Sequence, residues 1–154
     1  MEGHDKGIES LEAIVTDLYD EAMQIADHYW DTVNAHERRA TGYESRSALE
    51  LSCVKRGNNL QIVWKGIKWY GSKANRTRTR IAIARDSKNM TYTDAELKKH
   101  AKDWEWEVVR ETELQMQSIR RQAYHLVRAI MSIRAAKAVK RVADEKLQKL
   151  RDER

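Results

Sequence analysis

The sequence predicts an α+β fold in which an N-terminal helix, a three-stranded antiparallel β-meander and a long C-terminal helix follow one another. Apolar residues recur at helical spacing near both ends of the chain, whereas in the middle they occupy alternate positions. The 154 residues include no proline, so no proline interrupts a long helix. This length suits one domain. We place that domain at residues 1–134 and expect residues 135–154 to form a basic tail that is helical or partly disordered.

The first helix is predicted at about residues 9–38. Its apolar residues recur at alternating steps of four and three, which places them on one face. They are Leu11, Val15, Leu18, Ala22, Ile25 and Tyr29. Ser10 is the expected N-cap, because its hydroxyl can accept a hydrogen bond from a backbone N–H group that has no partner in the helix. Residues 39–47 are polar and predict a loop.

A β-hairpin is predicted next. Apolar residues occupy every second position in 49–53 and again in 60–64, the pattern of strands with one buried face. The segment 55–59 between them contains a glycine and two asparagines, which tolerate the positive φ angles of tight turns. We expect a bulge at Gly66, with the second strand continuing beyond it to Tyr70.

A third strand is predicted at residues 76–85. Its threonines and isoleucines share one face, because successive side chains of a strand point to opposite sides. Its first three arginines share the other face, and they are Arg76, Arg78 and Arg80. The predicted sheet therefore presents an arginine-rich surface.

The last helix is predicted from about residue 94 to at least residue 134. Thr93 and Glu96 have the spacing of a capping box. An apolar repeat of 3.5 residues runs from Val109 to Ile133 and fails beyond it. A helix this long, roughly 60 Å at ~1.5 Å per residue, needs a partner for its distal half. We expect that partner to be the first helix or a second copy of the chain, so a homodimer is predicted.

Charge is distributed unevenly, although the overall net charge is only +5. Residues 1–33 contain nine acids and one base, whereas residues 51–85 contain nine Lys and Arg and no Asp or Glu. Clustered cations favour a nucleic-acid partner, because each phosphate contact releases counterions condensed on the DNA. The alternative is a solvated surface whose arginines pair with the acidic first helix.

A surface for double-stranded DNA is therefore predicted on the sheet. Alternate arginines of a strand lie roughly 7 Å apart, close to the phosphate spacing along one DNA strand. Trp69 and Tyr70 have aromatic rings of the kind that stack on an unpaired base. The candidate residues are Lys55, Arg56, Lys65, Lys68, Trp69, Tyr70, Lys73, Arg76, Arg78, Arg80 and Arg85.

Catalytic and metal-binding motifs are not found, so no enzyme activity, cofactor or metal is expected. The five histidines form no H-x-H or H-E-x-x-H motif, and Cys53 alternates with leucines as a core residue does. Asp86 with Glu96 and Lys98 loosely matches a nuclease pattern, but Glu96 is already expected to cap a helix. A single cysteine fits a reducing compartment. Without a secretory signal or an apolar membrane span, the chain is predicted to be cytoplasmic.

Three segments carry a family resemblance: residues 28–36 at the end of the first helix, the hairpin 49–64, and residues 104–107 running into 111–120. In order and spacing they resemble the MobI family, conjugative transfer proteins of A/C-type plasmids and related integrative conjugative elements. The resemblance covers about residues 10–130. It implies an accessory factor that acts at the origin of transfer and helps the relaxase begin DNA mobilisation.

The resemblance supplies no catalytic residues. Relaxases of the His-hydrophobic-His type hold a metal with paired imidazoles beside a tyrosine nucleophile, and this chain lacks that motif. A role in conjugation would therefore rest on binding rather than cutting. The alternative hypothesis is a plasmid- or phage-encoded protein-interaction or regulatory module, which uses the acidic helix and the heptad repeat without binding DNA.

Overall fold

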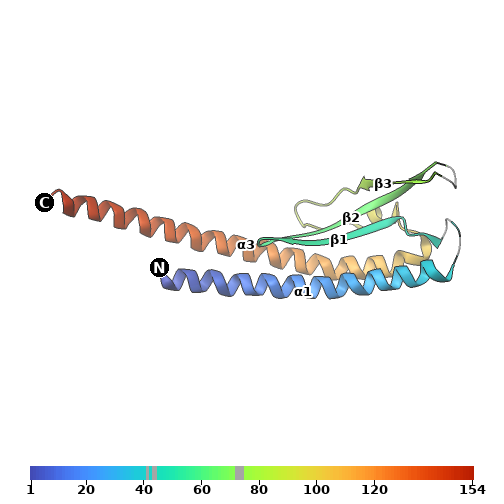
Figure 1. The fold of residues 1–154 in the computed structure, drawn as a ribbon, viewed down its shortest axis with the longest axis horizontal. Coiled ribbons are helices and arrows are strands. Elements are labelled where there is room, and N and C mark those ends of the chain that lie inside the picture. Colours follow the sequence, from blue (N-terminus) through green and yellow to red (C-terminus); the bar gives the residue numbers. More distant parts are fainter. Residues whose placement is uncertain (41, 43–44, 72–74) are drawn as a thin grey trace.

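Two long antiparallel helices carry a small β-sheet on one side (Figure 1). The computed structural model describes residues 1–40, 42, 45–71 and 75–154. The elements in chain order are α1 (Glu2–Arg39), β1 (Leu49–Arg56), β2 (Asn59–Tyr70), β3 (Thr77–Ala82), α2 (Asp94–Lys98) and α3 (Asp103–Asp152). The sheet is antiparallel with the order β1-β2-β3. The predicted α+β architecture is confirmed.

Helix α1 is longer than the sequence predicted. It begins at Glu2 rather than near residue 9, so the prediction of Ser10 as the N-cap is wrong. Tertiary packing holds the first turns, since Ile8 is buried and a Cβ atom at Gly7 would lie 3.3 Å from the Cδ1 atom of Ile133 on α3. These contacts involve side chains far apart in sequence, and they extend the helix without a side-chain cap.

The predicted C-terminal helix is divided in two. The Thr93 hydroxyl accepts a hydrogen bond from the Glu96 N–H group at 3.2 Å, as the capping box predicts. The Glu96 carboxylate, however, accepts from the Lys99 ammonium at 2.8 Å. Helix α2 then ends at Lys98, and Lys102 adopts extended backbone angles before α3 begins at Asp103. The prediction that one helix begins at residue 94 is therefore wrong, because the long helix begins at Asp103.

Helix α3 continues as one helix through most of the predicted tail and ends at Asp152. Lys137 still contacts α1, because its ammonium forms an ion pair with the Asp5 carboxylate. Every residue beyond Lys137 is exposed. Figure 1 shows this end of α3 projecting past the N-terminus of α1. We call residues 138–152 the α3 overhang.

The hairpin has the predicted strands with a tighter turn. Arg56 pairs with Asn59, so the connection consists of two residues, and Gly57 at its first position has a φ of +59°. Gly66 does not form a bulge, because it pairs in continuous register with Leu49 on one side and Ile81 on the other. Glycine is required there for a different reason: a Cβ atom would lie 2.6 Å from the Nδ1 atom of His100.

The core lies between the sheet and the helical hairpin. Alternate residues of β1 and β2 are buried as predicted, namely Leu49, Leu51, Cys53, Ile62 and Trp64. The Tyr29 ring of α1 meets the Trp64 ring edge-on, with ring centroids 5.0 Å apart. On α3 the predicted apolar repeat supplies the opposing surface, including the fully buried Met116. The sheet is thereby fixed with one face against the helices and the other face turned away.

A buried ion pair crosses this core. The Arg120 guanidinium and the Glu113 carboxylate make two hydrogen bonds of 2.8 and 2.9 Å, and the two residues are 4% and 1% exposed. The same carboxylate accepts from the Trp64 indole N–H at 2.9 Å and from the Tyr92 backbone N–H at 3.0 Å. Arg120 also donates to the Ile62 carbonyl at 3.0 Å. The pair therefore joins α3 to β2 and to the segment before α2.

A second buried acid lies at the beginning of α3. The Glu105 carboxylate accepts hydrogen bonds from the Ser47 hydroxyl at 2.8 Å and from the Ala48 N–H group at 3.4 Å. Its side chain is fully buried, and burial raises the pKa of Glu105 to about 7. The buried Tyr29 hydroxyl has no hydrogen-bond partner among the described residues, and burial also raises the pKa of this phenol.

Candidate nucleic-acid interface

The outer face of the sheet gathers five of the predicted DNA-binding residues. Residues paired across antiparallel strands share a face, and the buried face is fixed by Leu51 and Trp64. The register therefore places on the outer face Arg56, Lys65, Trp69, Arg78 and Arg80. We call this set the outer sheet surface. It lies on the side of the sheet opposite the buried core, although Trp69 and Arg78 also line a hollow with residues of α1.

The remaining candidates lie elsewhere. Lys55, Lys68 and Tyr70 alternate with the outer set and so belong to the opposite face, where the Lys68 ammonium lies 5.8 Å from the centre of the Tyr70 ring. Arg76 is exposed immediately before β3, and Arg85 follows the strand. Lys73 lies outside the described residues. The structure thus separates the predicted set into several locations.

The arginines of β3 are held by one acid. The Glu50 carboxylate on β1 lies 2.5 Å from the Nη2 atom of Arg78 and 2.9 Å from the Nε atom of Arg80. The two arginine side chains remain 43% and 59% exposed. Two guanidinium groups around one carboxylate leave one positive charge, and Lys65 adds another beside Glu50 in the register. The arginines of the acid-free segment 51–85 therefore pair with Glu50, an acid that lies one residue before that segment.

Trp69 is less accessible than a stacking platform requires. Its side chain is half-buried and lines a hollow of about 320 Å³ with residues of α1 and β1. The indole Nε1–H group is buried and has no hydrogen-bond partner among the described residues. Trp69 lies directly beside Arg78 in the register. Tyr70 is 51% exposed, but it lies on the opposite face.

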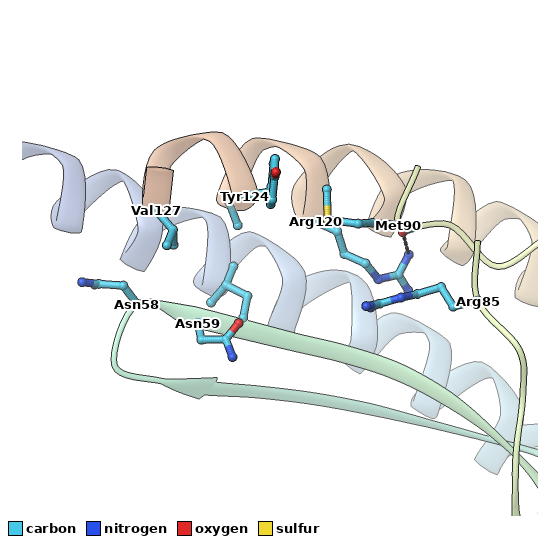
Figure 2. Close-up of a pocket in the computed structure, with 9 residues that line it drawn as sticks. Asn58, Asn59, Arg85, Met90, Arg120, Tyr124 and Val127 are labelled. Carbon is cyan, nitrogen blue, oxygen red and sulfur yellow. Dashed lines mark hydrogen bonds between the residues drawn. The ribbon is translucent and has the colours of Figure 1, made fainter. Parts of the chain in front are cut away.

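A second cationic location is a cleft of about 160 Å³ between the hairpin turn, residues 85–90 and α3 (Figure 2). None of the described residues that line this cleft is an acid. Arg85 and Arg120 both line it, and because Arg120 is paired with Glu113, Arg85 supplies the unbalanced charge. Tyr124 also lines it, with its hydroxyl accepting a hydrogen bond from the Arg128 guanidinium at 2.7 Å.

The sequence contains a signal for this second location that the prediction missed. Residues 114–143 of α3 contain seven Lys and Arg and no Asp or Glu. The apolar repeat of the same stretch faces α1 and the sheet, so the cations other than the buried Arg120 lie on the other faces of the helix. Its exposed cations include Arg121 and Arg128 on the outward side of α3. A search for acid-free stretches along the whole chain would have found both cationic segments.

The described residues offer no group of three His, Cys, Asp or Glu side chains that could hold a metal ion. Asp86, the first residue of the weak nuclease pattern, instead closes a turn. Its carboxylate accepts hydrogen bonds from the Asn89 side chain at 3.0 Å and from the Lys88 N–H group at 3.0 Å, and these bonds lower its pKa. In the part of the chain that the structure describes, none of the helices is long and apolar enough to cross a bilayer.

The fold and the site define a small α+β protein in which a helical hairpin supports a sheet with a cationic outer surface. The family model described as MobI protein matches residues 18–134. The chain belongs to the MobI family, as the three sequence segments indicated, and this membership associates it with conjugative mobilisation. No curated protein and no solved structure shows significant similarity to it.

Proposed function

We propose that this protein binds duplex DNA at an origin of transfer and assists the relaxase there as an accessory factor without catalytic activity of its own. The observation that carries the proposal is the outer sheet surface, on which Lys65, Arg78 and Arg80 lie around the Glu50 carboxylate and Arg56 adds a fourth cation at the far end of β1. A two-stranded ribbon of this kind fits the major groove of DNA. Membership of the MobI family supports the choice of an origin of transfer as the DNA site.

Glu50 has two opposite effects on phosphate binding: its charge competes with the phosphate, but its ion pairs also order the two arginines. Its carboxylate holds Arg78 and Arg80 in fixed positions, so less side-chain freedom is lost when a phosphate binds. The ion pairs are half-exposed, and such pairs contribute little stability. A phosphate can therefore compete for the guanidinium groups. The cleft beside Arg85 would then contact the backbone farther along the duplex.

The direct test replaces Arg76, immediately before β3, together with Arg78 and Arg80 of that strand. Arg76→Ala, Arg78→Ala and Arg80→Ala together remove three expected phosphate contacts. Each contact contributes about 0.9 to the slope of log K against log salt, so the slope should become less steep by roughly 2.7. Fluorescence anisotropy over a salt series, with origin-of-transfer DNA and with random DNA, measures the slope and the preference together.

The matched control replaces three exposed cations outside the sheet, Lys149, Arg151 and Arg154, which carry the same total charge. If the triple arginine variant binds with an unchanged salt slope, the outer sheet surface is not the DNA-binding surface. If neither the unaltered protein nor the control binds DNA at ~150 mM salt, the proposal fails as a whole.

A second prediction concerns Glu50, because the proposal makes this acid a competitor of the phosphates. Glu50→Gln should strengthen DNA binding several-fold at low salt, since it adds one positive charge locally and releases two guanidinium groups. Glu9→Gln on α1 changes the net charge equally at an exposed site that has no ion pair with a described residue, and it should leave binding unchanged. Equal affinities for all three proteins would show that DNA does not contact these arginines.

The second candidate function is a protein-interaction module that does not bind DNA. The ion pairs of Arg78 and Arg80 favour it, because they give both arginines a role within the sheet. The same salt series decides between the candidates. A module of this kind would show no DNA binding at ~150 mM salt and would retain its protein partner when the arginines are replaced.

A further inference from the structure

The α3 overhang carries an apolar stripe that none of the described residues of its own chain covers. Val139, Leu147 and Leu150 are 72%, 44% and 49% exposed. With Ala143 they recur at steps of three and four, which places them on one face of the helix. The overhang extends α3 without new nucleation, but packing of an apolar face supplies most helix stability in proteins, and these turns lack it within the described chain. The stripe therefore indicates a partner that lies along the overhang.

Cations border this stripe. At about 100° per residue, Lys140 lies on one side of it and Lys146 on the other. Residues 134–154 as a whole contain eight bases and four acids. Asp144 pairs with Lys140 and Glu145 pairs with Arg141 within the helix, and because these pairs are exposed they are weak enough for a partner's acid to compete with them. The partner should therefore present an apolar strip with acids on both sides.

A groove of that character lies between α1 and α3, and the described residues that line it all belong to these two helices. It has a volume of about 270 Å³, and its apolar side chains are Ile25 and Val108. Glu21 lines it from α1 and Glu111 lines it from α3. Among the described residues that line it, His28 is the one member of the His, Lys and Arg group.

Acids extend both walls of the groove. Asp17 precedes Glu21 by one turn on α1, and Glu107 precedes Glu111 by one turn on α3. All four acids are exposed, and none forms an ion pair with a described residue. The groove thus repeats the pattern of the overhang with opposite charge, an apolar strip between two charged rows.

We propose that the α3 overhang of one copy lies in this groove of a second copy, and that the second copy does the same, so that an antiparallel homodimer forms. If the two α3 helices cross near residue 128, residues 138–152 of one copy lie opposite about residues 104–118 of the other. That range contains both Glu107 and Glu111. One two-fold axis therefore satisfies both contacts at once, as an isologous interface requires.

The inference goes beyond the proposed DNA binding and does not depend on it, because neither surface includes the sheet. The test uses the full chain in sedimentation equilibrium at about 50 mM and about 500 mM salt. The unaltered protein should sediment as a dimer, twice the 18.0 kDa of one chain, at low salt. Its dissociation constant should rise with salt, because ions screen the contacts between exposed charges.

Charge reversals identify the two surfaces. Lys140→Glu with Lys146→Glu should raise the dimer dissociation constant at least about ten-fold, and Glu107→Lys with Glu111→Lys should do the same. All four substitutions together should restore dimerisation to within a few-fold, because the charges again match. The matched control, Asp20→Lys with Asp31→Lys, changes the charge of α1 outside the groove and should leave the dimer intact. Circular dichroism verifies that each variant is folded.

Three outcomes overturn the proposal. The first is a protein that remains monomeric at about 100 µM and low salt. The second is a dimer that none of the charge reversals weakens, or that the fourfold variant fails to restore. The third is that Lys140→Glu with Lys146→Glu weakens DNA binding and leaves the dimer intact. The overhang would then be a DNA-binding element and not a dimer contact.

Discussion

Glu113→Ala should destabilise the protein by about 3–5 kcal/mol, the range found when one partner of a buried ion pair is removed. The substitution leaves the 4% exposed Arg120 guanidinium with an uncompensated charge. It also removes the acceptor of the Trp64 indole N–H and of the Tyr92 backbone N–H. Typical domains are stable by only about 5–15 kcal/mol, so this loss should be visible directly in urea unfolding at constant protein concentration.

Two further variants show whether the uncompensated charge causes the loss. Replacing both partners, with Glu113→Leu and Arg120→Met, should recover part of the stability, because no buried charge then remains. Asp20→Ala, an exposed acid on α1, should change the free energy of unfolding by less than about 0.5 kcal/mol. A loss below about 1 kcal/mol for Glu113→Ala would contradict the buried network.

The stability of the protein should fall as the pH rises from about 4.5 to about 7, because of Glu105. The folded pKa of this carboxyl is raised to about 7 from its ordinary value of 4.5. Between these values the folded state keeps a proton that the unfolded state has released, so raising the pH favours unfolding. The full difference is on the order of 3 kcal/mol, present below pH 4.5 and lost above pH 7.

The comparison with Glu105→Gln isolates this residue from the other groups that titrate. The amide is neutral at every pH and can still accept a hydrogen bond from the Ser47 hydroxyl. The variant should therefore lose the decline between pH 4.5 and pH 7 and be more stable than the unaltered protein above pH 7. Urea unfolding at pH 4.5, 6 and 8 measures the difference. Parallel pH profiles for the two proteins would show that Glu105 is ionised in the folded state.

Periodic patterns predicted the elements of this fold well, because each depends on residues close in sequence. Alternation over 49–53 and 60–64 predicted both strands of the hairpin and their buried side chains. The break between α2 and α3 was missed, because residues 99–102 contain neither glycine nor proline and follow a helix-like pattern. Leu97 of α2 is fully buried in the core, so α2 is held by contacts with residues distant in sequence, which a local pattern does not contain.

The charged residues were predicted less well, because their partners are distant in sequence. Glu105, Glu113 and Arg120 stand in a helix rich in charge, where acids and bases usually face solvent, yet all three are buried. Their partners on β2 and near residue 47 lie about 50 residues away along the chain. Glu50 was missed as the partner of Arg78 for the same reason, since strand pairing brings it across the sheet.

The two edges of the sheet differ in how they resist the addition of a further strand. At β1 the Trp30 indole of α1 donates to the Leu51 carbonyl at 3.3 Å, so helix α1 occupies that edge. No described element pairs with the outer edge of β3. This strand is short and rich in arginine. Short length and charge both discourage edge-to-edge aggregation. The alanine variant that tests DNA binding therefore also removes this protection, so light scattering should accompany its titrations to separate aggregation from lost affinity.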